Sequence, residues 1–556
     1  MNDDNKPNWY NTRQSRRRFV GGASAVGIGA AALSIVGCGD DDDDTGSETP
    51  GAGQTPGAGQ TPGASPTSAD KPKTGGTMIG AQTADFNMST GYPFVGLAEN
   101  PYLAIPVETG IQYRDSLEPE LVLLDKFEFN TDRSGLVVNL KPGLEFHNGA
   151  PVTADDFVFG IKVIQDPKSY GITGSFQTAA FAKAITKINV VSKTEVEFTF
   201  DQPRVNMADF FTQLKVIHAA SFDDTKAGKA INGTGPYIFK NWTPGQTATF
   251  EKNANWHGTA EFGGPYMDGI EVKFFGDQDA MGLAYQAGEL DHMFGALASL
   301  AKQFEKLVHV TPKTGLTYMG MNVTNPDLTD ARVRKAIFMA VDRERVVNEL
   351  NEGFGTVTSQ PWPKSSPAFD PKLEGALFDP AASKKLLSEA GWKQTAPIPF
   401  NHRTTQAYVN LASLIQQNLK DVGIEVQLIP SDPTAFLALL RAREFKGFWT
   451  TTHSFSNMAP LTNFQQTFPY QQPNISYYDN PKYIELVKAL TNLDPLSEAA
   501  KKEYAIFNDL WLNDPFLVPL APNENPQLVS KRVRGYGEYL VSPANEPVFD
   551  KVWLDS

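Results

Sequence analysis

The chain has seven histidines, and histidine is both a common metal ligand and a common general base. They occupy positions 147, 218, 257, 292, 309, 402 and 453, and no two have metal-ligand spacing on one helix. The chain has a single cysteine, so neither an intramolecular disulfide nor a thiolate metal cluster can form. The sequence therefore predicts no metal site and no cofactor.

Hydrolytic and nucleotide-dependent chemistry has no better support. The chain contains no G-x-S-x-G nucleophile elbow, no H-E-x-x-H zinc motif and no P-loop. The acid pairs Asp155/Asp156 and Asp277/Asp279 suit helix caps and turns. A hydrolase with a carboxylate dyad obeys no spacing rule and stays open as an alternative. We expect a protein that is not an enzyme.

One stretch combines rings and hydroxyls in a way that suits binding. Residues 447–468 read GFWTTTHSFSNMAPLTNFQQTF, and no acidic residue occurs between Glu444 and Asp479. Such an uncharged run in an acidic chain could be buried core, a partner surface or the wall of a ligand pocket. The rest of the chain has to decide between them.

The composition describes a globular, acidic chain of several domains. Its 556 residues suggest roughly two to four domains, and the hydrophobic fraction of 41% is ample for packed cores. The formal net charge is −14. An acidic body without a basic tract is poorly suited to nucleic acid, whose binding depends on neutralising phosphates.

The N-terminal residues have the order of an export signal. A basic segment ending in Arg18 is followed by an uncharged run of small and aliphatic residues to Val36. Arg16 and Arg17 resemble the pair in a twin-arginine signal, and the sequence IVGC at 35–38 resembles a bacterial lipobox. The resemblance implies an export signal over 1–37, cleavage before Cys38 and a lipid on its sulfur. An uncleaved signal anchor is the alternative.

Residues 38–74 are expected to form a lipid-anchored, disordered tether. Five aspartates at 40–44 precede the repeat PGAGQT, which occurs twice from Pro50 and begins a third time at Pro62. This composition cannot bury enough apolar area to fold.

Helix and strand signals recur from about residue 75 onward. The run 136–140 predicts a strand, and Thr153 predicts the N-cap of a helix. Asp379, with proline next to it, predicts another N-cap. A further helix is predicted where hydrophobic residues recur at helical spacing. Its buried face would be formed by Val333, Ile337, Val341 and Val346.

Several of these segments together resemble family 5 (peptide/nickel-type) solute-binding proteins of ABC importers. Residues 144–157, LEFHNGAPVTADDF, resemble the F-H-D-G-x-P-[LV]-T-A-x-D-V signature of that family. Five further segments resemble family motifs in the same order: 233–237 (GTGPY), 288–291 (GELD), 325–337 (NPDLTDARVRKAI), 378–392 (FDPAASKKLLSEAGW) and 423–426 (GIEV). His147 and the pair Asp291–His292 lie inside such motifs, and we interpret them as structural.

The resemblance implies an α/β fold of the two-lobe periplasmic-binding-protein type (type II, cluster C) with an extra subdomain and discontinuous lobes. Lobe I would comprise 75–94, 231–308 and 517–556, with the subdomain at 95–230, and lobe II would comprise 309–516. The solute would bind between the lobes of a monomer outside the cytoplasm, tethered to the cell membrane. The receptor would then deliver the solute to a membrane permease.

The resemblance also places the ligand wall in the ring-rich stretch. Peptide receptors of the family carry an aspartate for the ammonium group of the peptide, and a rough alignment puts that region at 451–455, where no acid stands. Either another lobe supplies an acid for an oligopeptide, or the solute is uncharged there, as a sugar, a modified peptide or another amphipathic solute would be. A chemosensory or chaperone-like receptor of the same fold is the alternative. The expected ligand-binding residues are Trp449, Thr451, Thr452, His453 and Phe455, with Tyr318 and Trp362 as further rings.

Overall fold

The computed structural model describes residues 71–94, 100–113, 117–172, 176–375, 377–453, 458–537, 540–541 and 546–555. Arg16, Arg17, Cys38 and Phe455 lie outside the described residues, as do the export signal and nearly all of the tether. Within the described ranges, no helix combines the length and the apolar character that crossing a membrane requires.

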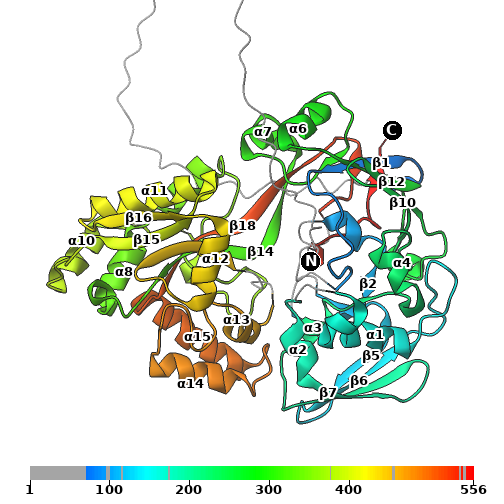
Figure 1. Ribbon diagram of the computed structural model, residues 1–556, viewed down its shortest axis with the longest axis horizontal. Helices are drawn as coiled ribbons and strands as arrows, with labels where there is room; N and C mark the ends of the chain where they lie inside the picture. The colour runs from blue at the N-terminus through cyan, green and yellow to red at the C-terminus, as the bar shows by residue number, and fades with distance from the viewer. Residues whose placement is uncertain are drawn as a thin grey trace, which may run out of the picture. The chain divides into compact units, whose positions relative to one another are not determined.

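A ten-stranded mixed sheet connects the two halves of the fold (Figure 1). Its strand order is β10-β11-β12-β1-β13-β18-β14-β17-β15-β16. The strands on the β10 side are β10 (Tyr237–Thr243), β11 (Thr247–Lys252), β12 (Gly269–Phe274), β1 (Thr77–Gln82) and β13 (His292–Met293). Those on the β16 side are β17 (Phe448–His453), β15 (Ile398–Arg403) and β16 (Val426–Ser431). Each side contains a parallel set, β12-β1-β13 on one and β17-β15-β16 on the other.

Two long antiparallel strands, β14 (Val308–Met321) and β18 (Leu517–Val529), join these sets. The far end of β18 pairs with β13, whereas the far end of β14 pairs with β17. Their mutual pairing changes register between Pro312 and Leu316. The backbone is therefore least regular where the strands pass from one parallel set to the other.

The side chains of the sheet divide between hydrophobic cores. One core gathers residues of β1 and β10–β12 with the segment 86–222, and another gathers residues from β14 to β18. Leu517, Val518, Leu520 and Ala521 pack in the second core, whereas Val529 packs in the first. β18 thus contributes side chains to both cores. The lobe boundaries, including the one expected at 517, stay predictions.

The segment before β10 carries its own four-stranded antiparallel sheet, in the order β5-β6-β8-β7. Its strands are β5 (Leu124–Phe129), β6 (Gly135–Leu140), β7 (Ile185–Val190) and β8 (Glu195–Phe200). The helix α1 (Ala154–Gln165) begins at Thr153, as predicted, and Asp156 completes a capping box with it. Tyr113, β5–β8, α1 and α3 (Ala208–Phe211) belong to what we call the subdomain.

The second half is rich in helices, some of which lie beside β15 and β16 in Figure 1. They are α8 (Ala331–Ala340), α10 (Pro380–Glu389), α11 (Gln406–Asp421), α12 (Pro433–Ala442), α13 (Pro460–Gln466), α14 (Pro481–Leu490) and α15 (Glu498–Asn513). The first half adds α6 (Gln278–Gln286) and α7 (Ala298–Gln303) beside smaller elements. Asp379 caps α10 as predicted, accepting a hydrogen bond from the Ala382 amide at 2.8 Å.

The helix expected through Val346 ends earlier than its hydrophobic pattern suggested. α8 stops at Ala340, Val341 is extended, and Asp342 caps a new turn. The break lets the fully buried Arg343 donate to the carbonyls of Val341 and Pro519. Burial lowers the pKa of Arg343 to about 9. Val341 and Val346 remain buried, so the pattern predicted burial correctly and the helix end wrongly.

The buried histidine His292 is structural, as expected. Its Nδ1 lies 2.6 Å from the Tyr102 hydroxyl and its Nε2 lies 2.8 Å from Oε1 of Gln527. Burial lowers the pKa of His292 to about 4, so the ring is neutral at physiological pH. The neighbouring Asp291 pairs with Arg532. His147 likewise contacts backbone oxygens, that of Gly235 at 3.0 Å.

Candidate ligand-binding site

The carboxyl ends of three parallel strands meet at one edge of the second half of the sheet. β17, β15 and β16 are neighbours, and they end at His453, Arg403 and Ser431. In open α/β sheets, ligands bind outside the carboxyl ends of the strands. Side chains at this edge are therefore the first place to look for ligand contacts.

Arg403 is the cation at this edge. Its Nη2 donates to Oγ1 of Thr451 at 3.0 Å. Its guanidinium carbon lies 4.9 Å from the ring centre of Tyr408 and 4.8 Å from that of Phe436, within the range of cation–π attraction. Among the residues that the structure describes, no Asp or Glu oxygen lies within 4.0 Å of its nitrogens. A half-buried guanidinium held in this way is preorganised for an anion.

The other buried arginines of the second half are used differently. Arg334 pairs with Asp514 and donates to the carbonyl of Pro515 at 3.0 Å. Arg343 donates to backbone carbonyls. The donor groups of both arginines make contacts within the fold. Arg403 donates to a hydroxyl and packs against two rings, so some of the five N–H donors of its guanidinium are left for a ligand.

Two of the expected ligand residues, Thr451 and Thr452, lie at the same edge. Thr451 is buried and accepts the hydrogen bond from Arg403. Thr452 is exposed and pairs with Thr317 of β14. Because alternate residues of a strand face opposite sides, the two threonines point to opposite faces of the sheet. They cannot both face one ligand directly, and Thr451 is the one that touches Arg403.

The large rings expected to stack on a ligand are core residues in this structure. Trp449 has no exposed surface and stacks on Phe445 at 5.2 Å between ring centres. Tyr318 is 1% exposed, and burial raises the pKa of its hydroxyl, which keeps the group neutral. Trp362 is 3% exposed and donates to Oδ1 of Asn508 at 3.2 Å. These rings are buried in the core and present almost no face to a solute.

His453 closes the strand end that carries the threonines. Its ring is 8% exposed, and its Nε2 lies 3.2 Å from the hydroxyl of Tyr470. The ring also packs against Tyr318 at 5.7 Å between centres. The histidine thereby ties the end of β17 to the aromatic core.

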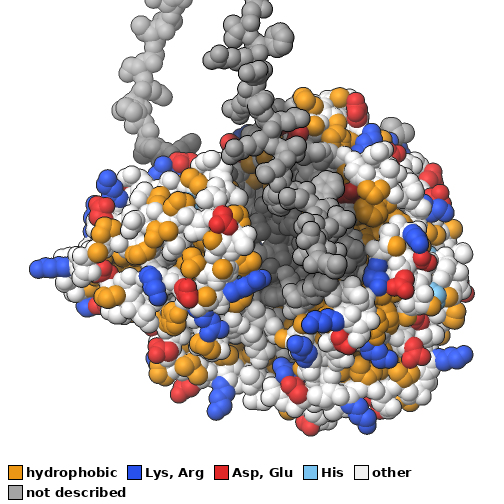
Figure 2. All heavy atoms as spheres, in the orientation of Figure 1, with side chains coloured by type: hydrophobic (Ala, Val, Ile, Leu, Met, Phe, Trp, Pro, Cys, Tyr) orange, Lys and Arg blue, Asp and Glu red, His pale blue; other side chains and the backbone are white. Residues whose placement is uncertain are grey.

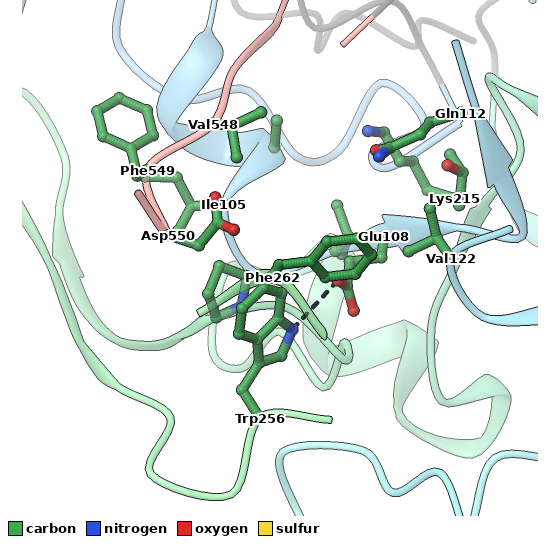
Figure 3. A pocket seen from close by; sticks show the side chains of 14 residues that line it. Ile105, Glu108, Gln112, Val122, Lys215, Trp256, Phe262, Val548, Phe549 and Asp550 are labelled. Carbon is green, nitrogen blue, oxygen red and sulfur yellow. Dashed lines mark hydrogen bonds between the residues drawn. The ribbon is translucent and has the colours of Figure 1, made fainter. Parts of the chain in front are cut away.

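A separate cavity lies in the first half of the molecule (Figure 3). It has a volume of about 90 Å³, and Figure 3 shows the rings of Trp256 and Phe262 next to each other in its lining. Glu108 in its wall accepts from Nε1 of Trp256 at 3.1 Å and contacts Nε2 of His257 at 2.8 Å. Pockets for drug-sized ligands measure about 300–1,000 Å³. This cavity is therefore too small for an oligomeric solute.

Arg403 is not among the ligand-binding residues predicted from the sequence. A usable signal was present, because the run IPFNHR at 398–403 is a short apolar strand that ends in a cation and is followed by a helix. What the sequence does not reveal is that β15 and β17 are neighbours. Only that pairing brings Arg403 against Thr451.

The two-lobe α/β architecture is that of bacterial solute-binding receptors. The sequence profile of the bacterial extracellular solute-binding proteins, family 5 (middle region), matches residues 118–474. The chain belongs to this family of extracytoplasmic receptors.

Relatives with assigned ligands agree with this family. The oligopeptide-binding protein AppA of Bacillus subtilis is 26% identical over 444 residues, which cover 72% of this chain and 77% of the relative. The glutathione-binding protein GsiB of Pectobacterium atrosepticum is 26% identical over 446 residues, covering 75% and 82%. The fold is similar to that of the ABC transporter substrate-binding protein CtaP of Listeria monocytogenes. The TM-score is 0.72 at 21% identity, and the match covers 87% of this chain and 100% of that one.

Proposed function

We propose that this protein is the solute receptor of an ABC importer and that its solute is an oligopeptide, or a similar oligomer, with a free carboxylate. The observation that carries the ligand class is Arg403, a half-buried cation without a carboxylate partner among the described residues. The oligopeptide-binding and glutathione-binding relatives have ligands that bear carboxylates. The receptor binds and releases this solute without changing it chemically.

The fold suggests how such a receptor signals that it is loaded. A solute bound at the edge of the second half and touching the first adds contacts that exist only when the halves are close together. It therefore shifts the population toward that closed form. The closed form is the one that the membrane permease recognises.

The ligand class can be tested with matched peptides. The full chain, carrying Cys38→Ser to keep it in solution, is screened by thermal shift against tetrapeptides that are unmodified, C-terminally amidated or N-terminally acetylated. Ligand at a hundred times its Kd stabilises a protein by about 2.7 kcal/mol. We expect the unmodified and acetylated peptides to raise Tm and the amidated ones to lose most of that rise. A neutral oligosaccharide mixture serves as the comparison.

The same screen can contradict the proposal. If only oligosaccharides stabilise the protein, the solute is a sugar and the proposed peptide ligand is wrong. Equal stabilisation by amidated and unmodified peptides would remove Arg403 as the carboxylate site. Mass spectrometry of solute that co-purifies with the protein gives an independent answer.

We infer further that Cys38 is lipidated and that Arg16 and Arg17 direct export. A lipid anchor confines the receptor within reach of its permease and raises the effective concentration of the pair. Cys38→Ser is expected to move the protein from the membrane fraction to the soluble fraction of cells. Replacing Ser34, which lies outside the IVGC motif, by alanine is the control. Unchanged membrane association of Cys38→Ser would contradict lipidation.

A further inference from the structure

The two halves of the molecule touch at a second place besides the β14–β18 pair. Asn206 of the subdomain donates to Oγ1 of Thr462 at 2.9 Å and to Oε1 of Gln465 at 3.2 Å. Arg133 and Asp494 form an ion pair across the same boundary at 2.5 Å. In Figure 1, α3 and α13 face each other here. We call this contact the interlobe patch.

Apolar side chains cross the boundary at the patch as well. Val205 of the subdomain belongs to the second hydrophobic core. Ala459, from the other side, belongs to the first core, and Leu496 packs against it. The centre of the patch is therefore buried, whereas the side chains of Arg133 and Asp494 are partly exposed.

Asp209 of α3 is the centre of the patch. It has no exposed surface. Its Oδ1 accepts from the Tyr113 hydroxyl at 3.0 Å within the subdomain. Its Oδ2 accepts from the amide of Ala459 at 3.1 Å and from the hydroxyl of Thr462. One carboxylate thus holds donors from both halves of the molecule.

The contact completes a helix end that lacks its own cap. Ala459 is the N-cap residue of α13 and cannot accept a hydrogen bond through its side chain. Helix N-termini leave amide groups without intrahelical partners, and a side-chain oxygen of a nearby Ser, Thr, Asp or Asn normally accepts from one of them. Asp209 supplies that oxygen here from a segment about 250 residues away in sequence.

We propose that Asp209 is a positioning residue that latches the subdomain to α13 and so couples closure of the lobes to the placement of α13. The latch exists only while the halves meet, because both bonds of Oδ2 go to the second half. When the halves separate, the carboxylate and the donors of Ala459 and Thr462 return to water. The inference does not depend on which solute the receptor binds.

Because Asp209 is fully buried, the latch is expected to depend on pH. The titratable groups that interact with it are Tyr113 and Tyr504, and the Arg133–Asp494 ion pair crosses the same boundary. Burial raises the pKa of the Asp209 carboxyl to about 6, although the bonds from Thr462, Tyr113 and Ala459 act to lower it. An exposed aspartate titrates near 3.9.

The direction of the pH dependence follows from the difference in the pKa of Asp209 between the latched and unlatched forms. Because the latched form has the higher pKa, it binds the proton more tightly and is favoured by acid. This added stability is complete below the ordinary pKa of aspartate and is lost as pH rises through about 6. Between pH 7 and pH 5 the ratio of latched to unlatched molecules should rise about tenfold.

Distances between spin labels measure the latch directly. The full chain with Cys38→Ser carries labels at Val191→Cys and Ile484→Cys, two exposed positions on opposite sides of the interlobe patch. We expect the short-distance population to grow from pH 7 to pH 5. Asp209→Asn, which is neutral at every pH, should abolish the pH dependence. Asp209→Ala, which loses the hydrogen bonds, should shift the population to longer distances at both pH values.

Matched control variants distinguish the loss of the latch from a general destabilisation of the fold. Asp201 pairs with Arg204 inside the subdomain, so Asp201→Asn should keep the pH response of the parent. Thr462→Ser keeps the hydroxyl that donates to Asp209 and should retain the latch, whereas Thr462→Val should weaken it. An unchanged pH response in Asp209→Asn, or unchanged distances in both Asp209→Ala and Thr462→Val, would overturn the proposal.

Discussion

Replacing Arg403 by methionine is expected to weaken the binding of a free-carboxylate peptide about 10- to 100-fold. A hydrogen bond to a charged group contributes about 1.5–3 kcal/mol, and each 1.4 kcal/mol is a factor of ten in affinity. Methionine fills much of the space between the rings of Tyr408 and Phe436, so the loss is mainly that of the cation. Isothermal titration with peptides from the thermal-shift screen measures the change.

The controls separate charge from shape. Arg403→Lys keeps the charge and loses the planar fork, so it should fall between the parent and the methionine variant. Thr451→Val removes the hydroxyl that accepts from Arg403 and should cost about tenfold or less. Arg441 is an exposed arginine of the same half, and Arg441→Met should leave affinity unchanged. Parent-like affinity in a folded Arg403→Met protein would contradict the proposed role of Arg403.

Substituting Gly320 by alanine is expected to destabilise the protein by about 3 kcal/mol. A Cβ at Gly320 would lie 2.1 Å from Cζ2 and 2.2 Å from Cε2 of Trp449, closer than side-chain atoms can approach. The indole cannot move away easily, because it is buried and stacked on Phe445. Overpacking of a well-packed core costs about 1–3 kcal/mol and occasionally more. Urea unfolding followed by tryptophan fluorescence and circular dichroism measures the effect.

A matched glycine and a double variant test the cause. A Cβ at Gly276 would meet nothing within 4 Å, so Gly276→Ala should change stability by less than about 0.5 kcal/mol. Combining Gly320→Ala with Trp449→Leu should cost less than the two single changes together, because the smaller side chain removes the clash. If Gly320→Ala unfolds at the same urea concentration as the parent, the close approach of the two residues is not essential.

Local signals in the sequence predicted local structure well. Thr153 and Asp379 were expected to cap helices, and they do, because a cap depends on a few neighbouring residues. The strand at 136–140 was also predicted, since its hydrophobic run is flanked by turn residues. The fold class followed from motifs that recur in a known family, and the family profile confirms it.

The proposed ligand site was harder to predict for two physical reasons. In a parallel sheet covered on both faces, successive residues are buried alike, so the run 448–451 gives no alternation that separates wall from core. Trp449 was therefore assigned to the ligand although it belongs to the core. The second reason is that Arg403 acquires its environment from β17 and α12, which lie far along the chain.

The helix boundary at Ala340 illustrates a third limit. The hydrophobic residues continue at helical spacing through Val346, and all of them are buried. What ends the helix is Asp342, whose side chain accepts from the amide of Arg345 at 2.9 Å and starts a new turn. Spacing alone records which side chains face the core and not whether the backbone between them is continuous.

The position of β18 has a consequence for how the chain folds. β18 is synthesised long after β13 and β14, yet it lies between them in the middle of the ten-stranded sheet. Its partner β14 precedes it by about 200 residues, and such long-range pairing makes folding slow because a long loop must close first. Until β18 is synthesised, the edges of β13 and β14 that pair with it stay unpaired. We expect a nascent chain that lacks residues 517–556 to remain incompletely folded in both halves.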